Sequence, residues 1–108
     1  MEEIKVNDYI RTYQGDIGKA KTITSTGIII EDERHIHFDG VTKHSQNIID
    51  LIEVGDIVEI FDVLHNDIFY IWNEEMLKAL REDIKNGIEI KSITTKEQFN
   101  SIKYVIGE

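Results

Sequence analysis

Short apolar runs alternate with polar turns along most of the chain, and within the runs apolar and polar residues alternate with a period of two. That period places every second side chain on one face and is typical of β-strands. In the first half the pattern predicts a hairpin and two further strands, at residues 6–23, 27–31 and 34–38. In the second half it predicts four strands, at residues 56–63, 68–72, 88–93 and 104–106.

One segment has helical periodicity instead. Its apolar residues recur at the spacing of a single helix face: Met76, Leu77, Leu80 and Ile84. Asn73 precedes them as an N-cap, and Gly87 follows where a left-handed residue ends a helix. The pattern predicts one long amphipathic helix over residues 73–86. Short helical turns are expected over residues 46–50 and, after a capping box at residues 94–97, through Phe99.

A repeated phrase indicates an internal duplication. Val-Gly-Asp-Ile-Val at residues 54–58 follows Val-Asn-Asp-Tyr-Ile at residues 6–10 by 48 positions, and residues 104–108 carry a weaker echo. The order of short strands and helical turns resembles a small SH3-like β-barrel. We therefore predict an α+β protein, mainly of short antiparallel strands, built from two fused SH3-like halves of about residues 1–52 and 53–108. The alternative is a single irregular barrel in which the repeat is coincidental.

Composition limits the classes of protein that the chain can belong to. A length of 108 residues with 41% hydrophobic residues predicts one compact domain, residues 1–108. No apolar run approaches the roughly 18 residues that span a membrane, and the acidic first residues do not form a signal peptide. Cysteine is absent, which excludes disulfides and thiolate chemistry. These features predict a cytoplasmic protein.

The net charge of −9 is concentrated in one window. Between Lys43 and Lys78 the chain has eight acidic residues and no Lys or Arg, so this window carries −8 of the −9. Proteins that bind DNA or RNA contact phosphates through Lys and Arg, so direct nucleic-acid binding is not expected.

The acidic window predicts a surface for a basic partner. Seven of its residues are expected to remain solvated and to contribute to one continuous negative face: Glu53, Asp56, Glu59, Asp62, Asp67, Glu74 and Glu75. Such a face would be complementary to a basic, nucleic-acid-binding groove on another protein. The alternative is a surface that only keeps the protein soluble.

One further group of residues is a candidate for chemistry. His35, His37 and Asp39 alternate on one strand, in a pattern that can bind a metal, although a solvated strand face gives the same pattern. The chain has no nucleophile elbow and no glycine-rich phosphate loop before a helix. We predict no catalytic site, no metal site and no cofactor, and therefore a protein that is not an enzyme.

The aromatic strand at residues 68–72 has apolar residues on both faces. Phe69 and Ile71 share one face, and Tyr70 and Trp72 share the other. We expect one pair to lie in the core. The other pair either forms a contact surface or lies under the helix of residues 73–86, and we favour the helix.

Three segments resemble a known group of proteins: residues 4–12, 43–58 and 90–99. They are similar to small uncharacterised proteins encoded by phages and prophages of low-GC Gram-positive bacteria, and the likeness covers about half of the chain. The resemblance implies a phage protein that acts inside a bacterial cell. It implies no particular functional residues.

Combining the charge with this resemblance gives three functional hypotheses. The first is a phage-encoded inhibitor of a host nucleic-acid-binding factor such as a CRISPR effector nuclease, that is, an anti-CRISPR protein. The second is a sponge or regulator for a small signalling molecule, for which a basic cluster would be needed: Arg11, Lys19, Lys21 and Lys43. The third is an accessory phage protein without catalytic function.

Overall fold

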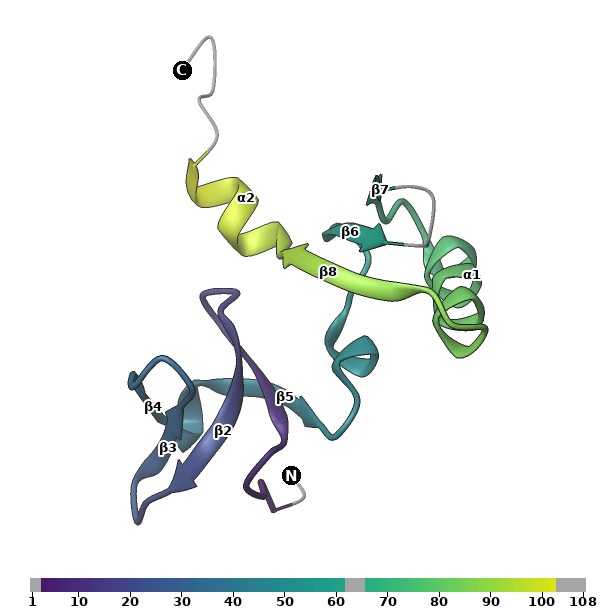
Figure 1. The fold of residues 1–108 in the computed structure, drawn as a ribbon. Helices are drawn as coiled ribbons and strands as arrows, with labels where there is room; N and C mark the ends of the chain where they lie inside the picture. Colours follow the sequence, from purple (N-terminus) through teal and green to yellow (C-terminus); the bar gives the residue numbers. More distant parts are fainter. Residues whose placement is uncertain (1–2, 62–65, 103–108) are drawn as a thin grey trace, which may run out of the picture. The chain divides into compact units, whose positions relative to one another are not determined.

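The computed structural model of the chain describes residues 3–61 and 66–102. The chain divides into two compact units, Met1–Leu51 and Ile52–Glu108, and each unit is described by itself. The fold is α+β, with mostly short antiparallel strands in two sheets and few helices, which confirms the predicted class (Figure 1). Among the described residues the sheets do not close into a barrel. The strand predicted at residues 104–106 lies outside the described part of the chain.

The first unit is a five-stranded antiparallel sheet in the order β4-β3-β2-β1-β5. Its elements are β1 (Tyr9–Thr12), β2 (Ile17–Ile23), β3 (Gly27–Ile30), β4 (His35–His37), the 3₁₀ turn η1 (Phe38–Gly40), β5 (Val41–Ser45) and the 3₁₀ turn η2 (Ile48–Leu51). The hairpin and the next two strands confirm the predictions made from alternation. Strand β5 was missed, because no strand was predicted between residue 38 and the helical turn expected over residues 46–50.

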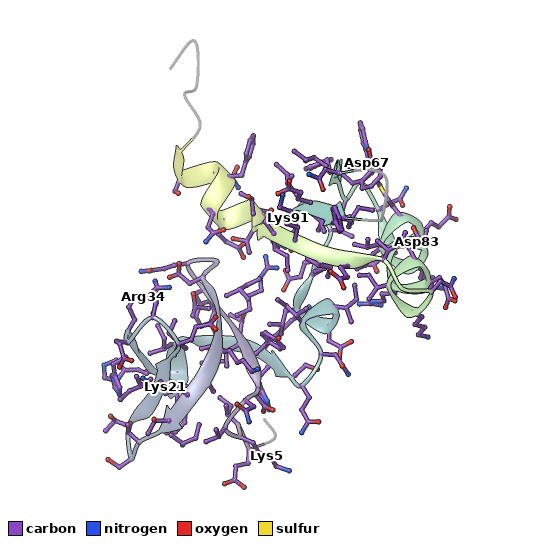
Figure 2. All side chains as sticks on the ribbon, viewed as in Figure 1. Lys5, Lys21, Arg34, Asp67, Asp83 and Lys91 are labelled. Carbon is purple, nitrogen blue, oxygen red and sulfur yellow. The ribbon has the colours of Figure 1, made fainter. Side chains whose placement is uncertain are left out.

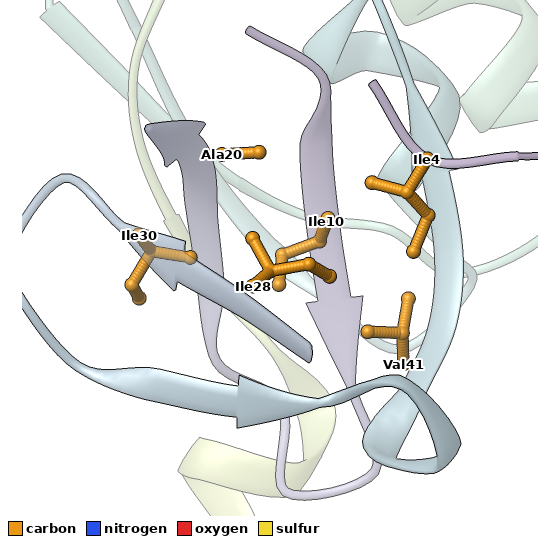
Figure 3. Close-up of a cluster of buried hydrophobic side chains, with 6 residues drawn as sticks. All are labelled: Ile4, Ile10, Ala20, Ile28, Ile30 and Val41. Atoms are coloured by element: carbon orange, nitrogen blue, oxygen red, sulfur yellow. The ribbon is translucent and has the colours of Figure 1, made fainter. Parts of the chain in front are cut away.

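The core of the first unit lies on one side of this sheet. Its buried side chains are Ile4, Ile10, Ala20, Ile28, Ile30 and Val41, shown in Figure 3. They come from four strands and from the segment that precedes β1, so residues distant in sequence pack together. Complete burial of a single isoleucine stabilises a fold by about 1.5–3 kcal/mol.

The second unit combines a three-stranded antiparallel sheet, in the order β7-β6-β8, with two helices. Its elements are β6 (Ile57–Phe61), β7 (Asn66–Tyr70), α1 (Glu74–Lys85), β8 (Glu89–Thr94) and α2 (Lys96–Ile102). Asn73 caps α1 by accepting a hydrogen bond of 2.9 Å from the Met76 N–H, and Gly87 follows the helix with φ of +104°. The predicted long helix is therefore confirmed with both of its end signals.

The capping box of the second helix lies one residue later in the chain than predicted. Thr95 is the N-cap, because its Oγ1 accepts from the Gln98 N–H at 3.3 Å and its own N–H donates to Gln98 Oε1 at 3.1 Å. The box is thus Thr-Lys-Glu-Gln over residues 95–98, and the glutamine takes the role expected of Glu97.

The two units begin with the same aspartate turn. In the first unit Asp8 Oδ2 accepts from the Lys5 N–H at 3.0 Å, and the Asp8 N–H donates to the Lys5 carbonyl at 3.0 Å. In the second unit Asp56 Oδ2 accepts from the Glu53 N–H at 2.8 Å, and the Asp56 N–H donates to the Glu53 carbonyl at 3.1 Å.

The hydrogen bonds to the next strand also correspond. The residue before each aspartate, Asn7 or Gly55, has a positive φ of 76° or 101°, as this turn requires. Asn7 donates to the carbonyl of Ala20 at 2.8 Å, and Gly55 donates to the carbonyl of Ile71 at 2.9 Å. Ala20 and Ile71 each return a hydrogen bond to the carbonyl of the aspartate, at 2.7 and 2.9 Å. In both units the first strand then lies between the second strand and the last one.

Candidate functional site

Helix α1 covers one side of the sheet in the second unit. Val58 and Phe69 are opposite each other on β6 and β7, so their side chains lie on the same side of the sheet. Phe69 and the buried Ile71, which follows β7, line a shallow hollow together with Met76 and Leu80 of α1. This side is therefore the packed side, and the apolar stripe of the helix lies against it.

The opposite side of the same sheet is the open face, which we define as Ile57, Glu59, Phe61, Ile68, Tyr70 and Trp72. The strand register places Tyr70 opposite Ile57, and Ile68 opposite Glu59. Four large side chains are well exposed there: Phe61 (45%), Ile68 (68%), Tyr70 (48%) and Trp72 (73%). The solvated side of an antiparallel sheet normally carries polar residues, so this concentration of apolar groups makes the open face the candidate functional site.

The favoured expectation, that one pair lies in the core and the other under α1, is wrong, because α1 packs against Phe69 and Ile71 and the second pair, Tyr70 and Trp72, is exposed. A helix can cover only one side of a strand, and the alternation of the strand directs Phe69 and Ile71 toward α1. Tyr70 and Trp72 therefore extend from the other side. The sequence contained a signal for an exposed apolar face, because a strand that is packed on one face and has apolar residues on both must expose the apolar residues of its other face.

The rings of Tyr70 and Trp72 form an edge-to-face pair. Their centroids are 5.6 Å apart and their planes meet at 82°. This is the preferred geometry for two aromatic rings, and both rings remain largely accessible. Exposed Trp and Tyr side chains are the residue types that most often dominate the binding energy of protein interfaces.

Glu59 is the charged residue on the open face. Its Oε1 accepts a hydrogen bond of 3.0 Å from Ser92 Oγ, and its Oε2 lies 3.8 Å from the ammonium group of Lys91, which is labelled in Figure 2. The register makes Glu59 a diagonal neighbour of Tyr70 across β6 and β7. Both of its contacts are residues of β8, which flanks β6 on the side away from β7, so the Glu59 carboxylate is directed away from Tyr70 in this structure.

Asp56, one of the seven acidic residues predicted to be solvated, is completely buried. Its Oδ2 accepts from the Glu53 N–H, and its Oδ1 accepts from the Lys96 N–H at 3.0 Å. The prediction that Asp56 stays solvated is therefore wrong. A carboxylate just before a strand can satisfy backbone donors, and here it holds the start of β6 to the start of α2.

The other acidic residues of the prediction are divided among different surfaces. Glu53 forms an ion pair of 2.8 Å with Lys96. Asp67 is exposed but lies opposite Ile60, on the packed side of the sheet, whereas Glu59 lies on the open face. Two more, Glu74 and Glu75, are exposed in the first turn of α1. Asp62 lies outside the described residues.

His35, His37 and Asp39 line a hollow of about 290 Å³ in the first unit. The two imidazole rings are 5.0 Å apart, and His35 Nε2 lies 3.3 Å from Thr24 Oγ1. Over the described ranges, no group of three His, Asp or Glu side chains is close enough to hold a metal ion.

The four basic residues considered for an anionic ligand do not form one exposed cluster. Arg11 is completely buried and donates from Nη1 to the Leu51 carbonyl at 2.9 Å. Lys21 forms an ion pair with Glu33. In the same unit, a hydrogen bond from Arg34 to Asp32 raises the pKa of the exposed Arg34 guanidinium.

Comparison of the chain with protein-family models, with curated proteins and with solved structures finds no match. Of the helices in the described residues, none has the length and apolar character needed to cross a membrane.

Proposed function

We propose that this protein is a non-catalytic binding protein whose open face contacts a partner protein. The observation that carries the proposal is the exposure of four large apolar side chains on one side of a sheet whose other side is packed. Burial of such a patch in an interface removes apolar surface from water at about 25 cal/mol per Å². The proposal assigns no catalytic residue and no cofactor to the chain.

Charge supports a basic partner. The chain carries a net charge of −9, and the window that includes the open face contributes −8 of it. Negative charge of this size accelerates the approach of a positively charged surface and makes association depend on salt. The partner that we propose is a basic, nucleic-acid-binding groove of a host factor inside a bacterial cell, for example that of a CRISPR effector nuclease. The chain would then act as a phage-encoded inhibitor.

We also infer that the first unit has an SH3-like architecture and that the second unit is a divergent repeat of it. The strand order β4-β3-β2-β1-β5, with a 3₁₀ turn just before the last strand, supports the first inference. The matching aspartate turns, 48 residues apart, support the second. In the second unit, α1 occupies the place in the chain order that β3 and β4 have in the first.

Affinity capture from a nuclease-treated host lysate tests the function. The parent and three variants are immobilised in equal amounts: Trp72→Ser and Tyr70→Ser on the open face, and Tyr13→Ser as the control. Tyr13 is 71% exposed but lies in the first unit, so its loss removes a similar area elsewhere. Captured proteins are identified by mass spectrometry at low and high salt.

The proposal predicts that the parent and Tyr13→Ser retain the same nucleic-acid-binding protein and that both open-face variants lose it. Salt and added nucleic acid should release it, because both compete for the basic groove. Equal capture by all four proteins would show that the open face is not the contact surface. Retention that is indifferent to salt and nucleic acid would contradict a basic groove as the partner.

A further inference from the structure

The open face offers two features that suit a single kind of side chain. One is the exposed Tyr70–Trp72 ring pair, and the other is Glu59, a diagonal neighbour of Tyr70 in the strand register whose carboxylate now contacts β8. We infer that this site receives an arginine side chain of the partner. The inference rests on the proposed function, because it specifies what the open face recognises.

The ring pair can bind a cation. A guanidinium group is attracted to the face of an aromatic ring, most strongly to that of tryptophan. Because the planes of Tyr70 and Trp72 meet at 82°, the two rings bound a corner instead of a flat surface. With Trp72 73% exposed, its ring is accessible to a group that arrives from solution.

Glu59 adds a hydrogen-bond acceptor once its flexible side chain turns from β8 toward β7. Its present contact with Lys91 is long, at 3.8 Å, and the side chains of Lys91 and Glu59 are 54% and 27% exposed. A long ion pair with an exposed lysine is weak, so an arriving cation can replace Lys91, although the turn also gives up the hydrogen bond from Ser92 Oγ. The planar guanidinium can stack on a ring and donate to a carboxylate at the same time, which the compact, strongly hydrated ammonium of lysine does less well.

A second copy of the chain is disfavoured as the occupant. Each copy carries a net charge of −9, so self-association through this face would bring like charges together. A neutral apolar anchor would gain nothing from the net negative charge of the chain, whereas a cationic anchor is attracted by it. A cationic partner satisfies both the rings and the carboxylate.

Titration with three blocked octapeptides tests the inference directly. Each peptide alternates glycine with a second residue, which is arginine, lysine or citrulline. Trp72 is the only tryptophan of the chain, so its fluorescence reports on the open face. Acrylamide quenching first checks that Trp72 is accessible in the free protein. The arginine peptide should bind at least about five-fold more tightly than the lysine peptide of equal charge, and the neutral citrulline peptide should not bind.

Variants measured by calorimetry separate the rings from the charge. Trp72→Leu keeps an apolar side chain but should remove the preference for arginine over lysine. Glu59→Gln should weaken binding of the arginine peptide by several-fold, and Tyr13→Leu, the matched control, should change nothing. Far-ultraviolet circular dichroism confirms that each variant is folded.

Equal affinity for the arginine and lysine peptides, or a preference that survives Trp72→Leu, would overturn the inference. Quenching that depends on protein concentration without any peptide would identify a second copy as the occupant and would also overturn it. The proposed function can fail separately. If lysate capture requires Trp72 but the peptides show no preference, only the arginine site is refuted. If the preference is found but no basic partner is captured, the proposed function is refuted.

Discussion

Replacement of Asp56 by alanine should destabilise the second unit strongly. The buried carboxylate accepts hydrogen bonds from the Glu53 N–H at 2.8 Å and from the Lys96 N–H at 3.0 Å. Lys96 is the first residue of α2, so the carboxylate also compensates the positive end of that helix. The alanine variant loses both hydrogen bonds at once.

The size of the effect follows from these contacts. A hydrogen bond to a charged group contributes about 1.5–3 kcal/mol, so the loss of two is expected to cost about 3–6 kcal/mol. Domains of this size are stable by about 5–15 kcal/mol in total, which makes the loss a large fraction. Asp56→Asn keeps one carbonyl oxygen but turns an NH₂ group toward a backbone donor, so it should lose roughly half as much.

Guanidinium unfolding measures the free energy of unfolding by linear extrapolation. Trp72 is in the second unit and is the only tryptophan, so its fluorescence follows the unfolding of that unit. Asp67→Ala removes an exposed carboxylate from the same unit and should change the free energy by under about 0.5 kcal/mol. A loss of under about 1 kcal/mol for Asp56→Ala would mean that the two N–H groups find other acceptors, and the argument from burial would fail.

Three further predictions test the fold and the surface. Leu80→Asp places a charge on the face of α1 that packs against the sheet, where Leu80 is only 6% exposed, and should lower the free energy of unfolding by several kcal/mol. A melting temperature within about 2 °C of the parent would mean that the helix is not docked. Gly27→Ala should disrupt the β3–β4 pairing, because the new Cβ would lie 2.1 Å from the Ile36 carbonyl oxygen. Gly40→Ala is the control and should be tolerated, because the atom nearest to its Cβ would be 3.8 Å away. Amide hydrogen exchange of β3 compares the two variants, and similar protection in both would contradict the clash. Trp72→Ser should change the free energy of unfolding by under about 0.5 kcal/mol, and a large loss in denaturant unfolding would show that Trp72 is a structural residue.

Local signals predicted the helix well. Asn73, the apolar stripe and Gly87 all lie within one segment, so its start, face and end could be derived without knowledge of the rest of the chain. Strand β5 had no such signal. Val41 is its one buried residue, and the strand depends on pairing with β1, which is about 30 residues earlier. Pairing over that distance leaves no periodic pattern in the strand itself.

The candidate surface was predicted only in part. Alternation correctly separated Phe69 and Ile71 from Tyr70 and Trp72, but it could not determine which side α1 would cover. Asp56 was misjudged because charge was treated as a sign of exposure. Its position after Gly55, at the start of a strand, was the better guide, since turn aspartates commonly bind backbone N–H groups.

The aspartate turn of the second unit has a consequence for synthesis on the ribosome. The Asp56 carboxylate accepts one of its hydrogen bonds from the N–H of Lys96, which is 40 residues later in the chain. Strand β6 likewise has the late strand β8 as one of its two neighbours. At translation rates of about 5–20 residues per second, roughly 2–8 s separate the emergence of these two partners. During that interval Val58 and Ile60 lack part of their native cover. We therefore expect the nascent second unit to expose apolar surface for longer than the first unit, in which the hydrogen bond from Arg11 to the Leu51 carbonyl can form once Leu51 has left the exit tunnel.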